Sequence, residues 1–421
     1  MSRVNPNLAA ALRLLPQERP VKPLRCRVRA SAVRRLKGGT PWVFDRTIDE
    51  APDNGRAGDL VAIYDQRRQP LGLGLWDPDS PLRVRRVSEQ GGSPIDGDYF
   101  LQRIAGAMAR REGLLAPTCT TGYRWVNGES DGMPAWILDR YGDTAVLKLY
   151  STVWMPFLAE LLPTLQELLP VARVVLRLAR KVQAAYGRFA LSDGLVILGD
   201  EADISAAPFL EDGALLEAQV IKGQKTGFFL DQRENRARVR AAASGRRVLD
   251  LFSFSGGFSL AAARGGAMEV FSVDGDGNAL QQAARHFAMN RDDVAVAACE
   301  HHCVRQDVFA ALADFEARGE RFDLVVVDPP SFAANATSVE HALSAYAHLA
   351  QAAAKVLRGD GRMLFCSCSA HITESAFMEA LRRGLGLHWV SGGGPYGLPA
   401  DHPASFPEAH YLKAVWMQAG S

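Results

Sequence analysis

The chain has 421 residues, of which 48% are hydrophobic and 23% are charged, and it contains six cysteines. This composition is typical of a soluble globular protein long enough for two or three hydrophobic cores, and it argues against a disordered chain or a small disulfide-rich domain. The net charge of +1 is unevenly spread, because residues 1–111 hold 20 Lys and Arg against 12 Asp and Glu. A basic N-terminal third on an acidic body indicates a part that binds a polyanion, with a solvated basic surface as the alternative.

The start of the chain carries no targeting signal that we recognise. Its short apolar patch is interrupted by Arg13 and lacks a small-residue cleavage site before Pro16, so we expect no signal peptide. No apolar run reaches the length of a transmembrane helix, and we expect no membrane association. The cysteines show no regular spacing, which favours reduced thiols in a cytoplasmic protein. We interpret residues 1–23 as a short extension that could be mobile.

Residues 24–96 are predicted to form a small β-barrel or sandwich that binds RNA. From Leu24 onward, arginines alternate with smaller residues at period two, and turn signals recur about every ten residues. A basic strand face beside aromatic residues suits contact with an RNA backbone and with stacked bases, although the aromatic residues could simply be core. The candidate RNA-binding cations here are Arg25, Arg27, Arg29, Arg34, Arg35 and Lys37.

Three further segments are expected downstream. Residues 97–117 have apolar side chains at helical spacing and are typical of a linker helix, and residues 118–215 predict a separate α+β domain without a chemical motif of its own. Residues 216–421 form the last domain, which begins with a short strand around Phe228 and a basic helix capped by Asp231. That helix is either solvated or lines a site, and its Arg233 is a further candidate RNA contact.

The last domain alternates regularly between strand and helix patterns. The expected strands are 248–252, 269–274, 303–307, 322–328 and 362–368, and the expected helices are 258–264, 279–289, 308–318, 339–357 and 374–384. This alternation predicts an α/β fold with a doubly wound, mostly parallel sheet.

The stretch RVLDLFSFSGGFS at residues 247–259 predicts a strand, a glycine turn and a helix, which is where open α/β sheets bind nucleotides. Aspartates end four successive strands, and their mutual repulsion would be relieved by a cationic ligand. A sulfonium with an ammonium group, S-adenosylmethionine, therefore suits the row better than a dinucleotide does. The candidate cofactor residues are Asp250, Phe252, Ser255, Gly256, Gly257, Asp274, Asp307, Asp328 and Pro329.

Two motifs bear on the methyl acceptor. DPPSF at residues 328–332 has a stiff loop and Phe332, which could stack on a flipped base. LFCSCSAH at residues 364–371 ends a strand in two thiols, Cys366 and Cys368. Carbon 5 of a pyrimidine becomes nucleophilic once a thiolate attacks C6, so an enzyme that methylates this carbon needs a cysteine and a base. Two buried structural cysteines are the alternative.

A further cluster, CEHHC at residues 299–303, could in principle ligate zinc. Its spacing is too tight to wrap one ion without distant ligands, and we expect no metal site.

At these motifs the sequence resembles the bacterial 23S ribosomal RNA large-subunit methyltransferase I family. The resemblance covers residues from Leu24 onward and is strongest in KTGFFLDQRENR, LDLFSFSGGFS, DPPSF, FCSCS, ADHP and YLK. It implies an N-terminal PUA domain, a middle α+β domain and a Rossmann-like methyltransferase domain that uses S-adenosylmethionine to methylate cytosine C5. It places Cys368 at the nucleophile position and Gly256, Asp274, Asp307 and Asp328 at cofactor positions. Ser331, where many members have Lys, and the additional thiol of Cys366 depart from the family pattern.

We therefore expect a cytosine-C5 methyltransferase acting on 23S ribosomal RNA, with Cys368 as nucleophile and Asp328 as the nearest candidate base. A homodimer is compatible with this interpretation. Two alternatives are a guanine N-methyltransferase that uses the DPPSF loop and a non-catalytic RNA-binding assembly factor.

Overall fold

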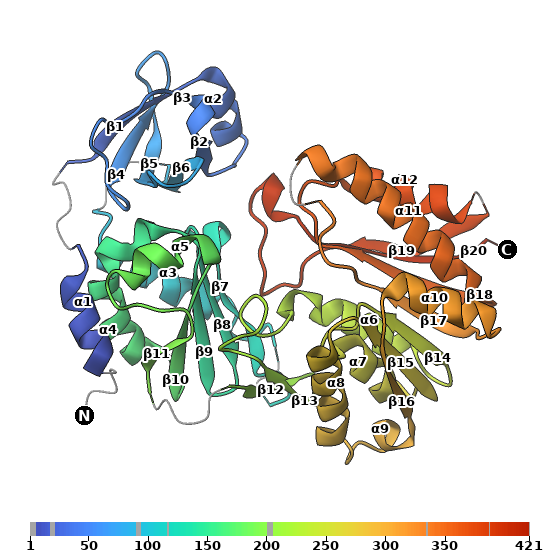
Figure 1. The fold of residues 1–421 in the computed structure, drawn as a ribbon. Helices are drawn as coiled ribbons and strands as arrows, with labels where there is room; N and C mark the ends of the chain where they lie inside the picture. Colours follow the sequence, from blue (N-terminus) through green and yellow to red (C-terminus); the bar gives the residue numbers. More distant parts are fainter. Residues whose placement is uncertain are drawn as a thin grey trace. The chain divides into compact units, whose positions relative to one another are not determined.

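The computed structural model describes residues 6–16, 22–89, 94–115, 118–199, 205–333, 336–386 and 388–420 (Figure 1). The chain divides into two compact units, and each consists of several segments. The first comprises Met1–Gly213, Glu217–Leu230 and Ala400–Ala409, and the second comprises Ala214–Leu216, Asp231–Pro399 and His410–Ser421. Within the described ranges, no helix combines the length and the apolar character needed to cross a membrane.

The N-terminal part of the first unit is a six-stranded sheet in the order β2-β6-β5-β4-β1-β3, in which β1 and β4 are parallel. Its elements are β1 (Leu24–Val28), α2 (Ala30–Lys37), β2 (Trp42–Phe44), β3 (Ile48–Glu50), β4 (Leu60–Tyr64), β5 (Pro70–Trp76) and β6 (Leu82–Ser88). Residues such as Cys26, Val43, Val61 and Trp76 form its core. The expected small β-domain is confirmed by this sheet.

We expected the basic stretch of this domain to continue as a strand. The structure divides it between a strand and a helix. The strand ends at Val28, Arg29 is the N-cap residue of α2, and the remaining cations lie on that helix. Ala32 and Leu36 are buried four residues apart, so helical spacing governs this segment once the alternation ends. Arg34, Arg35 and Lys37 are therefore helix residues.

The rest of the first unit is built on a five-stranded sheet in the order β11-β10-β9-β8-β7. Its elements are α3 (Gly97–Ala109), β7 (Gly122–Asn127), β8 (Trp136–Tyr141), β9 (Thr144–Leu149), α4 (Leu158–Leu168), β10 (Arg173–Leu178), α5 (Arg180–Gly187) and β11 (Leu195–Leu198), followed by the ribbon β12 (Ala207–Glu211) and β13 (Ala214–Ala218). The segment around Phe228, predicted as a strand, forms turns instead.

Two segments that we expected to be an extension and a linker helix are part of this core. α1 (Pro6–Leu14) buries Leu8, Ala11 and Leu12 in the same cluster as the sheet, so the described part of the N-terminal extension is a packed helix. α3 buries Phe100 and Ile104 there, which makes it a core helix and not a linker.

The second unit contains a seven-stranded sheet in the order β16-β15-β14-β17-β18-β20-β19, in which only the pairs made by β20 are antiparallel. Its strands are β14 (Arg247–Leu251), β15 (Glu269–Asp274), β16 (Glu300–Arg305), β17 (Phe322–Val327), β18 (Leu357–Ser367), β19 (Trp389–Tyr396) and β20 (Lys413–Ala419). The predicted doubly wound, mostly parallel sheet is confirmed, and the strand order reverses between β14 and β17.

Helices cover both faces of this sheet. They are α6 (Arg233–Ala242), α7 (Gly257–Arg264), α8 (Gly277–Met289), α9 (Val294–Ala298), α10 (Val308–Ala317), α11 (Val339–Lys355) and α12 (Glu374–Leu385). Alternate residues of β14 separate two cores: Leu249 packs with α10, α11 and α12, whereas Val248 packs with α6 and α7. The side chain of Asp250 shares the face of Val248 because strand side chains alternate.

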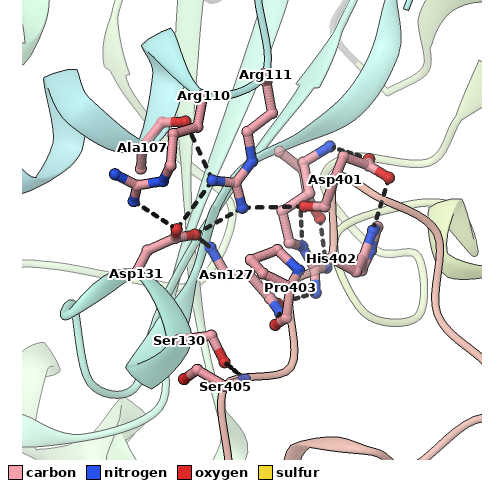
Figure 2. Close-up of polar contacts among 12 residues, drawn as sticks. Ala107, Arg110, Arg111, Asn127, Ser130, Asp131, Asp401, His402, Pro403 and Ser405 are labelled. Atoms are coloured by element: carbon pink, nitrogen blue, oxygen red, sulfur yellow. Dashed lines mark hydrogen bonds and ion pairs between the residues drawn. The ribbon is translucent and has the colours of Figure 1, made fainter. Parts of the chain in front are cut away.

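The segment Ala400–Ala409 lies in the first unit although both of its neighbours in the sequence lie in the second. Figure 2 shows its contacts. The carbonyl of Asp401 accepts from Arg111 at 3.0 Å, and its carboxylate accepts from the backbone N–H of Arg124 at 2.9 Å. Arg111 also makes a bidentate pair with buried Asp131, at 2.9 and 2.7 Å. Burial opposes ionisation of Asp131, but the bonds from Arg111 outweigh it and lower the pKa of this carboxyl.

The packing of α3 gives a stability prediction. Phe100 is fully buried and lies edge-on to Trp154 and Phe157, with ring centroids 4.8 and 5.0 Å away. Phe100→Ala should lower the free energy of unfolding by about 3–5 kcal/mol because it leaves a cavity. Leu114→Ala, at a position 45% exposed, is the control and should change it by about 0.5 kcal/mol or less. Urea denaturation measures both, and equal effects would show that α3 does not belong to the core.

Candidate active site

The turn after β14 is held in an uncommon backbone conformation. Phe252, Phe254 and Gly256 all have positive φ, at 60°, 47° and 71°. A Cβ on Gly256 would lie 2.6 Å from Cβ of Ala283, so both the backbone and the space require glycine. Gly256 is also the N-cap of α7, which begins at Gly257 and has no side-chain cap. The predicted strand, glycine turn and helix are thus confirmed, with Ser255 buried inside the turn.

Acidic residues line one edge of the sheet because the parallel strands β16, β15, β14 and β17 end there side by side. Asp307 follows β16, Asp274 ends β15, Asp250 is the second-last residue of β14 and Asp328 follows β17. The neighbouring strand, β18, is followed directly by Cys368. The sheet therefore brings four predicted carboxylates and the predicted nucleophile to a common edge.

Asp250 is the most unusual member of the row. Its side chain is buried, its Oδ2 accepts from Ser259 at 2.6 Å, and its Oδ1 has no hydrogen-bond partner among the described residues. Burial, together with the charges of Asp328 and Asp274, raises the pKa of its carboxyl to about 7. A buried oxygen without a partner in a cluster of acids fits a ligand that brings positive charge, as the sulfonium and ammonium groups of S-adenosylmethionine do.

Two of the other three carboxylates of the cofactor prediction, Asp274 and Asp307, are anchored by backbone N–H groups. Asp274 is partly buried and accepts from Phe254 at 2.9 Å and from Asp276 at 2.8 Å, so it fixes the glycine turn against β15. Each of its oxygens keeps a second lone pair for a ligand hydroxyl. Asp307 is exposed and caps α10 through its Oδ1, with bonds to Phe309 and Ala310. This side chain therefore acts as the N-cap of α10.

The structure separates the two thiols of the FCSCS motif. Cys366 lies inside β18 and is fully buried in the core beneath α6 and α7. Burial, with the charge of Asp328, raises the pKa of its thiol well above the usual range. Cys368 lies beyond the end of the strand and is partly exposed. Only Cys368 therefore combines a place at the sheet edge with access to a substrate.

Two polar residues near these thiols were missed by the sequence reasoning. Gln232, the last residue before α6, is buried, donates to Asp328 at 2.9 Å and hydrogen-bonds the thiol of Cys366. Lys413 begins β20 opposite Ser367, and its Nζ donates to the carbonyls of Ser369 and Ile372, both at 2.7 Å. The signals available were the LDQR and YLK segments, but nothing in their spacing places them beside the cysteines.

The charge of Lys413 is close enough to the thiol to matter for its chemistry. Burial lowers the pKa of Lys413, whereas the negative charge of a Cys368 thiolate raises it. The two carbonyl bonds use two of the three N–H groups of the ammonium and hold the loop that follows the thiol. A cation fixed in this way stabilises negative charge at this end of β18.

The DPPSF loop differs in part from its expected role. Pro329 is buried and stiffens the loop next to Asp328. Phe332 is only partly exposed, because it packs edge-on against Tyr346 with ring centroids 5.1 Å apart. The loop carries its aromatic ring toward α11, and Ser331 beside it is exposed.

The predicted RNA-binding cations fall into two groups. Arg25, Arg29, Arg34 and Lys37 are exposed. Arg27 is instead paired with Asp49 and Glu50, both at 3.3 Å, and Arg35 is paired with Glu408 at 2.6 Å. Arg233 begins α6 and is buried, so it does not belong to an exposed basic face.

The CEHHC cluster does not converge on one point. His301 stacks on Phe287 of α8, whereas His302 stacks on Phe271 and lies 3.0 Å from Glu269. Ligand atoms of Glu269, Glu300 and His302 do lie within 4.8 Å of one another, at the amino edge of the sheet. The negative charge of Glu269 is already balanced there by an ion pair with Arg247, which argues against a metal ion at this point.

Comparisons with known proteins give the family and the fold of the chain. A family model for S-adenosylmethionine-dependent methyltransferases matches residues 197–416, and a model for PUA-like domains matches residues 26–89. A methyltransferase structure from Streptococcus mutans superposes with a TM-score of 0.79 at 23% identity, covering 94% of this chain and all of the other. Another methyltransferase structure, complexed with SAH, gives a TM-score of 0.80 at 24% identity over 94% of this chain and all of the other. These two likenesses concern the fold.

Sequence relatives give the family. The chain is 44% identical over 403 residues to the ribosomal RNA large subunit methyltransferase of Deinococcus radiodurans, covering 94% of this chain and 97% of that protein. It is 35% identical over 392 residues to the ribosomal RNA large subunit methyltransferase I of Tolumonas auensis, covering 90% and 95%. With its S-adenosylmethionine-dependent methyltransferase domain and its PUA-like domain, this chain belongs to the ribosomal RNA large subunit methyltransferase I family.

Proposed function

We propose that this chain methylates C5 of a cytosine in 23S ribosomal RNA through a covalent bond between Cys368 and C6 of the base. The observation that carries the proposal is the pair of thiols at the end of β18. Cys366 is buried in the core. Cys368 lies at the edge of the sheet that carries the row of aspartates, near the buried ammonium of Lys413. An enzyme that methylates an exocyclic amine needs no thiol there, whereas C5 chemistry does.

The steps follow from the groups in place. The Cys368 thiolate attacks C6, and the electron pair of the C5–C6 double bond moves so that C5 becomes nucleophilic. The bound cofactor supplies the methyl group at its sulfonium. C5 takes that methyl as the methyl–sulfur bond breaks and its electron pair stays on sulfur, which leaves as a neutral thioether. A base then removes the C5 proton, and the S–C6 bond breaks to restore the ring and the thiolate. Asp328, oriented by Gln232, is the nearest candidate for the base.

The nature of the substrate rests on the relatives and on the N-terminal domain. Both relatives described above are named as methyltransferases of large-subunit ribosomal RNA. The PUA-like domain exposes Arg25, Arg29, Arg34 and Lys37, which suit contact with phosphates. The guanine N-methyltransferase alternative depends on Phe332, and that ring packs against Tyr346. A non-catalytic assembly factor would have no use for the row of aspartates.

The first prediction concerns the covalent intermediate. A 23S transcript containing 5-fluorocytosine should trap the wild-type protein as a complex stable to denaturing electrophoresis, because fluorine at C5 blocks elimination. Cys368→Ala should abolish this complex. Cys366→Ala is the matched control and should retain it, since this thiol is buried. A complex that persists in Cys368→Ala and disappears in Cys366→Ala would contradict the assignment.

The second prediction concerns Lys413. Lys413→Met should slow alkylation of Cys368 by iodoacetamide at pH 7 by about tenfold, because the thiolate loses a neighbouring cation. Lys413→Arg keeps the charge and should react close to the wild-type rate. Mass spectrometry of the peptide that contains Cys368 measures the rate for this thiol alone. Equal rates in the Met variant and the wild type would remove Lys413 from the mechanism.

The third prediction concerns RNA affinity. Changing Arg29 and Arg34 together to Ala should weaken binding of 23S RNA, and it should reduce the slope of log affinity against log salt by about two. Arg318→Ala removes an exposed arginine at the C-cap of α10 as a control and should leave the slope unchanged. Filter binding over a salt series measures both, and an unaltered slope in the double variant would exclude these cations from the RNA interface.

A further inference from the structure

A chain of hydrogen bonds runs from Asp250 through the sheet to the CEHHC segment. The hydroxyl of Ser259 donates to Oδ2 of Asp250 at 2.6 Å, and the hydroxyls of Ser259 and Ser272 lie 2.6 Å apart. The hydroxyl of Ser272 in turn lies 2.8 Å from Nε2 of His301. The four residues come from β14, α7, β15 and β16, so the chain links the cofactor edge to the outermost strand.

The inner members of this chain are shielded from water. Ser259 and Ser272 are fully buried, and Asp250 is 1% exposed. His301 is partly exposed, and its ring lies parallel to that of Phe287 with centroids 3.6 Å apart. Burial and the neighbouring His302 lower the pKa of His301 to about 4, so the ring is neutral near pH 7. A neutral imidazole has one N–H and one lone pair, which lets it end such a chain as a donor.

The chain then has one consistent direction. Ser259 donates to Asp250, so it must accept from Ser272, and Ser272 must accept from Nε2–H of His301. This arrangement commits Oδ2 of Asp250 to accepting. A proton on the carboxyl must therefore lie on Oδ1, which has no hydrogen-bond partner among the described residues.

The surroundings of Asp250 explain why it would hold a proton before the cofactor binds. Its charge is opposed by Asp328 after β17, by Asp274 of β15 and by burial, and Cys366 of β18 is a neutral thiol near it. Ser259 of α7 supplies its stabilising bonds. A cationic group arriving at this edge changes the balance, because it favours the ionised carboxylate.

We propose that His301, Ser272 and Ser259 orient Asp250 as the acceptor for a cationic group of S-adenosylmethionine, and that cofactor binding displaces a proton from Oδ1 of Asp250. The bond that breaks is Oδ1–H, the proton leaves to solvent, and the carboxylate so formed faces the cation. His301 acts here as a positioning residue. The proposal concerns loading of the cofactor and does not depend on which atom of the RNA is methylated.

The sign of the pH dependence follows from the raised pKa of Asp250, about 7. Below pH 7 the carboxyl is protonated before binding, so binding must release the proton and affinity falls, by up to about tenfold per pH unit. Above pH 7 the carboxyl is already ionised and no proton is released. Proton release should therefore approach one per cofactor at pH 6 and decline as the pH is raised through 7.

Isothermal titration calorimetry of the full chain without RNA tests this, with buffers of different ionisation enthalpy reporting the protons released. S-adenosylmethionine is the cationic probe, and 5′-methylthioadenosine, which lacks both cationic groups, is the neutral one. Asp250→Asn should release about one proton fewer than the wild type at pH 6, and it should weaken binding of the cation only. Any proton from the cofactor itself cancels in this comparison.

His301→Phe and His302→Phe form a matched pair, because the two side chains lie on opposite faces of β16 and both stack on phenylalanine. At pH 7.5, His301→Phe should lower the affinity for S-adenosylmethionine about threefold or more, whereas His302→Phe should bind the cofactor with wild-type affinity. Ser272→Ala breaks the same chain from another strand and should reproduce the His301 effect. In the Asp250→Asn background, neither His301→Phe nor Ser272→Ala should lower the affinity for S-adenosylmethionine any further.

Two results would overturn the proposal. One is an equal number of protons released by the wild type and by Asp250→Asn at pH 6. The other is equal affinity of His301→Phe, Ser272→Ala and His302→Phe for S-adenosylmethionine, with thermal denaturation showing all three folded.

Discussion

Parallel strand pairing in the order β16-β15-β14-β17-β18 is the constraint on which the site depends. Because parallel strands end at the same edge, residues far apart in the sequence meet there with like charges. Asp250, Asp274 and Asp328 would repel one another without bound donors or cations. Hydrogen bonds reduce this repulsion: Ser259 donates to Asp250, backbone N–H groups donate to Asp274, and Gln232 donates to Asp328. The remaining imbalance is what makes this edge suitable for a cofactor that carries positive charge.

The same edge places two cysteines that lie two positions apart in different surroundings. Inside a strand, positions two apart share a face, and the sequence could not tell a catalytic thiol from a packing neighbour. Because the strand ends at Ser367, Cys368 lies outside the core in which Cys366 is buried. Lys413 arrives from β20 to stand beside the loop after Cys368. The Lys413 ammonium supplies a positive charge near the Cys368 thiol from another strand.

Much of the fold could be predicted because its signals are local. Buried runs such as 322–327, the glycine turn at Gly256 and the regular strand and helix alternation each depend on nearby residues. The contacts that complete the site could not be predicted, since Gln232, Lys413 and His301 reach it from distant segments. The basic stretch after Leu24 misled the prediction because the arginine alternation continued one residue beyond the strand, from Val28 to Arg29, which is the N-cap of α2. This segment forms a helix because Ala32 and Leu36 pack into the core, and such tertiary packing overrides the local pattern.

In the proposed reaction the methyl group reaches C5 of a cytosine. The most direct measurement is nucleoside mass spectrometry of 23S ribosomal RNA, transcribed without modification and incubated with the full chain and S-adenosylmethionine carrying a labelled methyl group. We predict label in 5-methylcytidine, and none when Cys368 is replaced by Ala. Label in a methylated guanosine, or label in 5-methylcytidine that persists without the Cys368 thiol, would contradict it.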